Sequence, residues 1–176
     1  VAIIGCRDAS DYGKKVAFNF AYELAKEGFV VISGLARGID TYAHLGAVKA
    51  GGKTIAVLGS GLKHIYPSEN KKLCNEIVKN GGTIITEYEP HTKPLPMNFP
   101  SRNRIISGLS NGVLVVEAKQ KSGTLITVDY ALEQGKDVFV IPGNITSINS
   151  YGTNELIKQG AKLVTNTKEI IEEIIK

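Results

Sequence analysis

The sequence predicts an α/β fold: a doubly wound, mostly parallel sheet of the extended Rossmann-like type, with helices on both faces in three layers. Two observations predict it. Short apolar runs rich in β-branched residues alternate along the 176 residues with segments of helical periodicity. The runs are apolar throughout, which is typical of strands buried on both faces of a parallel sheet. A chain of this length is expected to form one domain, here residues 1–176.

Each expected element rests on a local pattern. Strands are expected at the apolar runs, at residues 1–5, 29–33, 54–59, 83–87, 114–117, 138–141 and 162–165. Helices are expected at the segments of helical periodicity, at residues 11–28, 39–50, 68–80, 124–135, 153–159 and from 168 onward. The first helix is clearest, with Val16, Phe20 and Leu24 on one face and Gly28 at its end. Right-handed crossovers then predict the strand order 3-2-1-4-5-6 about the first strand.

Composition restricts the function classes. The net charge of +4 and pI of about 9.0 permit an anionic partner without requiring one. No apolar run reaches the roughly 18 to 20 residues that a membrane span needs, so no membrane association is expected. Cys6 and Cys74 are too few for a disulfide framework or a zinc site, which favours a reducing, cytoplasmic setting. The chain opens on a strand residue, and we expect it to be an excised piece of a longer protein.

Ligands of doubly wound sheets bind beyond the carboxyl ends of the strands, so the loops found there are the candidates. Residues 30–44, VVISGLARGIDTYAH, are the most informative. Gly34 and Gly38 permit close backbone approach, the following helix offers free amides, and Arg37 matches phosphate geometry. From this loop alone, a tight turn with an incidental arginine is an equally good interpretation.

The other loops share the same chemistry of Gly, Ser or Thr, and Arg or Lys. A phosphate-binding edge is therefore the favoured hypothesis, and its further candidates are Arg7, Ser60, Phe99, Arg102, Arg104, Lys119, Lys121, Ser122, Gly123 and Thr124. All four arginines are expected in or beside loops, and residues 88–104 form the longest of these loops. Phe99 and Tyr66 are candidates for stacking on a base, although a core role is favoured for Phe99.

Several enzymatic patterns are absent. No G-x-G-x-x-G fingerprint or H-E-x-x-H motif occurs, and no G-x-S-x-G stretch marks a nucleophile elbow, which leads from a strand into a helix. Gly51–Thr54 precedes a strand, whereas a Walker loop precedes a helix. The histidines have no ligand spacing, and His44 is expected to be packed or capping. Glu87 and Glu117 end strands and could act as base or metal ligand, but an arginine partner is the favoured interpretation. We therefore expect no catalytic residue, metal or cofactor.

Four blocks of sequence closely resemble the DNA processing protein A (DprA/Smf) family, in order from residue 1 to about residue 164. They are SGLARGID, GKTIAVLGSGLKHIYPSEN, NFPSRNRIISGLS and VVEAKQKSGTLIT. The resemblance implies binding of single-stranded DNA, a homodimer, and loading of a RecA-type recombinase during bacterial DNA uptake and natural transformation. It implies that Arg37 and Lys121 contact the DNA backbone and that Arg102 and Arg104 lie in the same basic pocket. It also implies that flanking domains of the family are absent from this chain.

Enzymes that cleave nucleoside 5′-monophosphates, the LOG-like phosphoribohydrolases, share this fold. The competing hypothesis is that this chain is such an enzyme. Their P-G-G-x-G-T-x-x-E loop corresponds here to KSGTLITVDYALEQ, where the double glycine is missing and Glu133 falls too late. That departure argues against the hydrolase. A domain that senses a nucleotide without cleaving it is the third class left open.

Overall fold

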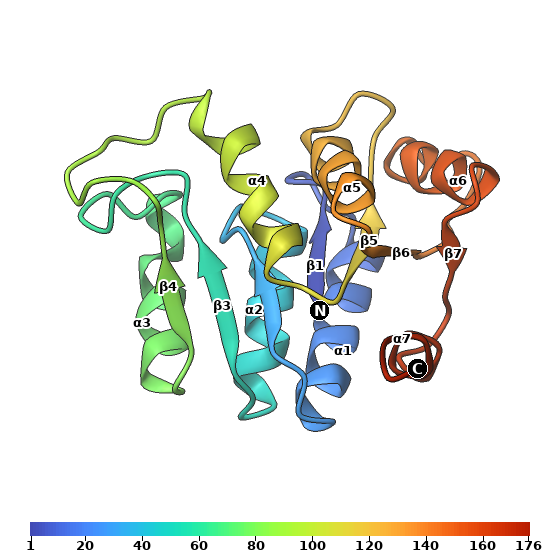
Figure 1. Cartoon of the computed structure of the whole chain (residues 1–176), viewed down its shortest axis with the longest axis horizontal. Coiled ribbons are helices and arrows are strands. Elements are labelled where there is room, and N and C mark those ends of the chain that lie inside the picture. Colours follow the sequence, from blue (N-terminus) through green and yellow to red (C-terminus); the bar gives the residue numbers. More distant parts are fainter.

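The computed structural model describes all 176 residues and has one seven-stranded sheet (Figure 1). All strand pairs are parallel, in the order β4-β3-β2-β1-β5-β6-β7. The strands are β1 Ala2–Gly5, β2 Val31–Ser33, β3 Thr54–Val57, β4 Thr83–Ile85, β5 Gly112–Glu117, β6 Asp137–Val140 and β7 Lys162–Leu163. The helices are α1 Asp11–Lys26, α2 Ile39–Lys49, α3 Lys71–Lys79, α4 Asn98–Gly108, α5 Gly123–Glu133, α6 Tyr151–Lys158 and α7 Lys168–Ile174, with short 3-10 turns at η1 Ser68–Asn70 and η2 Ile148–Ser150.

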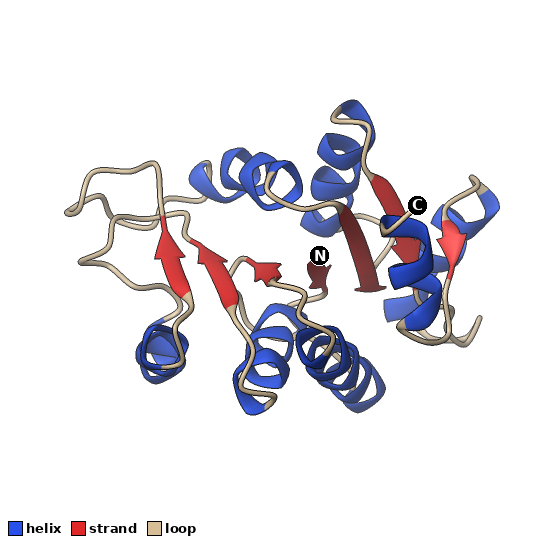
Figure 2. Cartoon of the chain, turned by 60° about the horizontal axis from the view of Figure 1, so that its bottom comes forward, coloured by secondary structure: helices blue, strands red, loops and turns tan.

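Helices cover both faces of the sheet, as Figure 2 shows, so the predicted three-layer α/β class is confirmed. Along β1, Ile3 packs with α1, α2 and α7, whereas Ala2 and Ile4 pack with α4, α5 and α6. Successive strand residues point to opposite faces, so burial on both faces requires apolar residues at every position. Burial on both faces therefore explains the unbroken apolar runs in the sequence.

The predicted strand order was wrong. The fourth strand lies outside β3 at the edge of the sheet, and β5 is the strand that pairs with β1. The chain adds four strands outward on one side before α4 carries it back across the other face. The direction in which successive strands are added to the sheet therefore changes between β1 and β5. A crevice is expected at this point, beyond the carboxyl ends of the two strands.

The second correction concerns residues 98–104, the last part of the long loop expected at residues 88–104, which belong to helix α4. Pro100 stands in the first turn of this helix, where no hydrogen-bond donor is needed from the backbone nitrogen. Phe99, Arg102, Asn103 and Ile106 recur at helical spacing, and all four line one cavity. Arg102 and Arg104 consequently lie on a helix.

Cys6 and Cys74 are both buried, unpaired thiols. No helix is at once long enough and apolar enough to cross a bilayer.

Candidate nucleic-acid interface

A cavity of about 440 Å³ lies beyond the carboxyl ends of β1 and β5, where the strand order reverses. We call it the main cavity. The loop after β1, the loop after β5 and helices α4 and α5 supply most of its wall. Its lining residues are Ile4, Gly5, Cys6, Arg7, Asp8, Ala36, Asp40, Pro96, Phe99, Pro100, Arg102, Asn103, Ile106, Lys119, Lys121, Ser122, Gly123, Thr124, Ile126 and Thr127.

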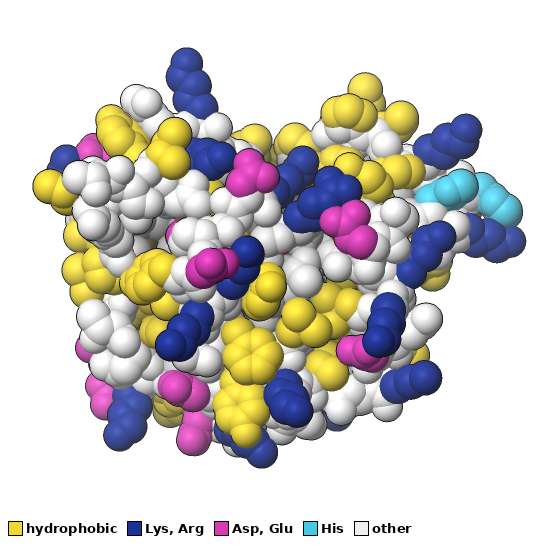
Figure 3. All heavy atoms as spheres, turned by 180° about the vertical axis from the view of Figure 1, so that it is seen from behind, with side chains coloured by type: hydrophobic (Ala, Val, Ile, Leu, Met, Phe, Trp, Pro, Cys, Tyr) yellow, Lys and Arg dark blue, Asp and Glu magenta, His cyan; other side chains and the backbone are white.

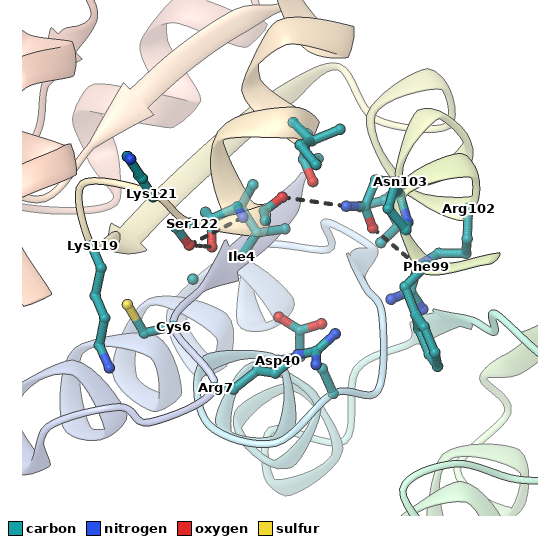
Figure 4. Close-up of a pocket in the computed structure, with 18 of the residues that line it drawn as sticks. Ile4, Cys6, Arg7, Asp40, Phe99, Arg102, Asn103, Lys119, Lys121 and Ser122 are labelled. Carbon is teal, nitrogen blue, oxygen red and sulfur yellow. Dashed lines mark hydrogen bonds between the residues drawn. The ribbon is translucent and has the colours of Figure 1, made fainter. Parts of the chain in front are cut away.

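Cationic side chains approach the main cavity from different sides (Figure 4). Lys119 and Lys121 come from the loop after β5, and Arg7 comes from the loop after β1. Arg7 and Lys121 are exposed, and neither has a carboxylate within ion-pair distance. Lys119 Nζ lies 3.1 Å from Asp8, whose side chain is largely exposed. The cavity therefore has two positive groups without a carboxylate partner, Arg7 and Lys121, and a third, Lys119, that is paired with an exposed carboxylate.

The first turn of α5 adds backbone donors to the same cavity. Ser122 caps the helix by accepting from the Thr124 amide at 3.2 Å, and its hydroxyl donates to Thr124 Oγ1 at 2.9 Å. No atom lies near the space that a side chain on Gly123 would occupy, so the helix end is open. Free amides and the positive end of the helix dipole make this turn a suitable anion site.

In the loop between β2 and α2, Gly38 is required because the backbone of the loop after β1 lies against it. A side chain at Gly38, whose φ is +74°, would collide with the carbonyl oxygens of Cys6 and Arg7. The Ile39 amide donates to the Cys6 carbonyl at 3.1 Å, so the loop after β1 covers the start of α2. The expected phosphate-accepting turn is thus closed by protein. The open helix terminus belongs to α5 instead.

Arg102 holds this loop from inside. Its side chain is 4% exposed, and one guanidinium nitrogen donates to the carbonyls of Gly34, at 2.7 Å, and Val57. The Gly34 amide in turn donates to the buried Asp40 carboxylate at 3.0 Å. Burial lowers the pKa of Arg102 to about 10, an effect that Asp40 partly offsets. A side chain on Gly34 would lie 2.8 Å from the guanidinium, so glycine is needed there for packing.

Burial also raises the pKa of Asp40, and the Arg102 charge and the Gly34 amide oppose that rise. Arg102 remains charged at neutral pH, but its Nη1 donates to backbone carbonyls and its Nε donates to the Asn103 side-chain oxygen at 3.1 Å. It is therefore a positioning residue for the loop after β2, and we do not assign it a phosphate.

Aromatic rings and arginines form a column beside the main cavity. The Tyr66 and Phe99 rings lie 5.6 Å apart at 52°. The guanidinium carbons of Arg7 and Arg102 lie 5.6 Å and 5.7 Å from the Phe99 centroid, and that of Arg37 lies 6.0 Å from the Tyr66 centroid. Both distances on Phe99 are within the range of cation–π attraction. Phe99 is thus a half-buried support for Arg7 at the cavity wall.

A narrow second hollow, which we call the side hollow, lies next to the main cavity. It is lined by Arg7, Gly34, Ala36, Arg37, Tyr66, Pro67 and Phe99, and three of these residues, Arg7, Ala36 and Phe99, line the main cavity as well. Arg37 reaches this hollow and does not line the main cavity.

Two predicted arginines are paired with carboxylates. Arg37 meets Glu69 through two hydrogen bonds, and that carboxylate raises the pKa of Arg37. Arg104 Nη2 lies 2.5 Å from Glu87, as expected for a carboxylate at the end of strand four, but Arg104 lines neither hollow.

The remaining candidates lie elsewhere. Ser60 is buried, donates to the His64 carbonyl at 2.6 Å and lines neither hollow. The prediction of an arginine beside Glu117 was wrong. This buried carboxylate accepts hydrogen bonds from the backbone amide and hydroxyl of Ser10, at the start of α1, and from the Asn149 side chain in η2. His44 is packed as expected, fully buried with Nδ1 2.7 Å from Thr54 Oγ1. No cluster of three or more His, Cys, Asp or Glu side chains could hold a metal ion.

A family model for DNA recombination-mediator protein A matches residues 1–175. The chain belongs to this family. It is 45% identical over 174 residues to the DNA processing protein DprA of Bacillus subtilis and 48% identical over 173 residues to that of Streptococcus pneumoniae. Protein Smf of Escherichia coli is 48% identical over 174 residues. These matches cover 98–99% of this chain but 58%, 61% and 46% of the relatives, so the chain spans only part of their length.

Solved structures of the family agree with the fold. The X-ray structure of S. pneumoniae DprA superposes with a TM-score of 0.91 at 48% identity, over 98% of this chain and 60% of that one. A structure described as giving insight into the single-stranded DNA binding mode of Helicobacter pylori DNA processing protein A superposes with a TM-score of 0.89 at 36% identity, over 99% and 79%. A molybdenum cofactor binding protein of Rippkaea orientalis, 22% identical with a TM-score of 0.67, shares the fold.

Proposed function

We propose that the main cavity binds a single strand of DNA through its phosphate backbone and that the domain is a binding module. The observation that carries this proposal is the convergence of Arg7, Lys119, Lys121 and the open first turn of α5 on one cavity. Charged donors and helix N-termini both favour phosphate oxygens. The H. pylori relative, described by its single-stranded DNA binding mode, has the same fold and supports the choice of ligand.

Cavity size favours a single strand over a duplex. About 440 Å³ is within the range of small-ligand sites, so it accommodates a nucleotide unit whose base and sugar are free of a complementary strand. Figure 3 shows the opposite face from Figure 1, where basic side chains are mostly scattered among acidic and uncharged ones. That face offers no continuous basic track for a duplex backbone.

Binding should be nearly independent of sequence, because cationic side chains and backbone amides recognise phosphate and carry no base code. Phe99 and Tyr66 are the candidates for stacking on a base, and stacking tolerates every base.

Family membership supports a wider role. We propose that the protein acts in bacterial DNA uptake and natural transformation, works in the cytoplasm as a homodimer, and loads a RecA-type recombinase on the bound strand. The strand-binding cavity is the part of that role which this domain would supply.

The competing hydrolase needs a carboxylate free to act in the cavity. Asp8 is paired with Lys119, and Asp40 accepts from the Gly34 amide beneath the loop. Both carboxylates are thus engaged, which supports binding without cleavage. Incubation with AMP tests this point: release of free adenine would overturn the assignment as a binding module.

Fluorescence anisotropy of a labelled oligo-dT across a salt series, beside the matching duplex, tests the proposal. We expect preference for the single strand and a log–log salt slope of about −2, since three cations each contribute about 0.7 on single strands. No binding at low salt, or equal affinity for the duplex, would contradict it. Competition by dTMP as strong as by the oligonucleotide would instead favour a nucleotide-sensing domain.

Lys121→Ala is expected to weaken strand binding about tenfold on every sequence tested and to make the salt slope shallower by about 0.7. The reason is loss of one exposed phosphate donor with no carboxylate partner. Lys79→Ala is the matched control, because Lys79 is an exposed lysine in the last turn of α3 and lines no hollow described above. Equal losses in the two variants would remove Lys121 from the site.

A further inference from the structure

Arg37 is exposed but already occupied. Its Nε and Nη2 donate to the two carboxylate oxygens of Glu69 at 2.6 Å and 2.9 Å, and each side chain is about half exposed. This fork-to-fork pairing is the geometry with which arginine also binds a phosphate. The carboxylate of Glu69 therefore fills the position where a strand phosphate would be recognised by Arg37.

Hydrogen bonds connect the two segments that carry Arg37 and Glu69. Glu69 lies in η1, and the neighbouring Asn70 side-chain amide donates to the Leu35 carbonyl at 2.8 Å and to Thr41 Oγ1 at 2.9 Å. Those two acceptors flank Arg37 in the sequence, so η1 is attached to the loop that carries the arginine. The pair is thus built into the junction of two loops, unlike an incidental contact between two mobile surface side chains.

The pair also shapes the side hollow. With Arg37 held over Tyr66, the space left between Arg37, Tyr66, Pro67, Phe99 and Arg7 is about 10 Å³, room for about one water molecule. The side hollow shares the lining residues Arg7, Ala36 and Phe99 with the main cavity, so the two hollows are neighbours. Movement of Arg37 away from Glu69 would widen the side hollow next to the main cavity.

We propose that Glu69 is an intramolecular counter-ion that holds Arg37 in the unbound protein and is displaced by a phosphate of the bound strand. The inference rests on the proposed function. Exposed ion pairs are weak, so a phosphate already delivered by the main cavity can compete for the arginine. When the strand binds, Arg37 exchanges the Glu69 carboxylate for a phosphate. Breaking the ion pair lowers the affinity for the strand below the value that the cationic side chains would give without Glu69.

Glu69→Gln tests the exchange, because glutamine keeps the shape and an acceptor oxygen but lacks the charge. We expect the affinity for oligo-dT to rise about threefold to tenfold and the salt slope to steepen by up to about 0.7, since Arg37 gains a phosphate without losing a carboxylate. Glu89→Gln is the charge-matched control: Glu89 is an exposed carboxylate in the loop before α4 that forms no ion pair. The control is expected to change the affinity by less than about twofold.

The same substitution in an Arg37→Ala background separates displacement from a general charge effect. Without Arg37, Glu69→Gln should give no more gain than Glu89→Gln. A full gain without Arg37, an unchanged affinity in Glu69→Gln, or a weaker affinity would each overturn the inference while wild-type binding still supported the proposed function. Failure of the wild-type chain to bind the strand would overturn the proposed function itself, and the inference with it.

Discussion

Arg102→Ala is expected to lower the free energy of unfolding by about 3 to 5 kcal/mol, the range found when one partner of a buried charge network is removed. Arg102 is 4% exposed and bonds the carbonyls of Gly34 and Val57, which belong to the loop after β2 and to strand β3. Its loss leaves both carbonyls without this donor and the buried Asp40 without its nearby positive charge.

Urea denaturation followed by circular dichroism measures this effect. Arg104→Ala is the matched control, because Arg104 stands two residues away on α4 in a half-exposed pair with Glu87, and it should cost less than about 1 kcal/mol. A decrease of similar size in the free energy of unfolding of both variants would contradict the role of Arg102 as a positioning residue for the loop after β2. It would also return Arg102 to the list of residues free to bind phosphate.

Acid is expected to destabilise the domain through His44. This side chain is fully buried, its Nε2 has no hydrogen-bond partner, and burial lowers its pKa to about 3. The unfolded chain therefore binds one more proton than the folded chain between about pH 6.5 and pH 3. The free energy of unfolding should fall by about 1.4 kcal/mol per pH unit in this range, approaching a total of about 5 kcal/mol.

His44→Leu separates this effect from other titrating groups. Thr54 keeps its own donation to the Val31 carbonyl at 2.7 Å, so leucine leaves no donor stranded. Denaturation at pH values from 6 to 4.5 should show a shallower pH dependence in the variant by about one proton. An identical pH dependence would contradict the assignment of His44 as the buried group that becomes protonated on unfolding.

The fold was largely predictable because burial leaves a local signature. Strands buried on both faces must be apolar at every position, and helix α1 repeats its apolar residues through Phe20 and Leu24. The strand order leaves no such local signature, because nothing in the sequence of a single strand indicates whether the fourth strand pairs with β3 or with β1. Helix α4 was missed because residues 88–104 were interpreted as one long loop, although the spacing of Phe99, Arg102, Asn103 and Ile106 already contained a helical face.

The site was predictable in its chemistry and less so in its geometry. Sequence reasoning placed Arg7, Lys121 and the first turn of α5 at one sheet edge, and the structure brings them to one cavity. It could not show that Gly38 is required by the backbone of Cys6 and Arg7, since those residues are more than 30 positions away. For the same reason, the pairing of Arg37 with Glu69, 32 residues later, was invisible.

Hydrogen exchange measured by mass spectrometry, with and without oligo-dT, tests most directly whether the strand occupies the main cavity. The loop after β1 and the segment that leads into α5 line the cavity and hold exposed residues, so their amides should report on a ligand. We expect the strand to slow exchange in residues 6–8 and 119–125 and to leave α3 and α7 unchanged. Unchanged exchange in both segments, with protection appearing elsewhere on a chain that binds the strand, would contradict the central claim.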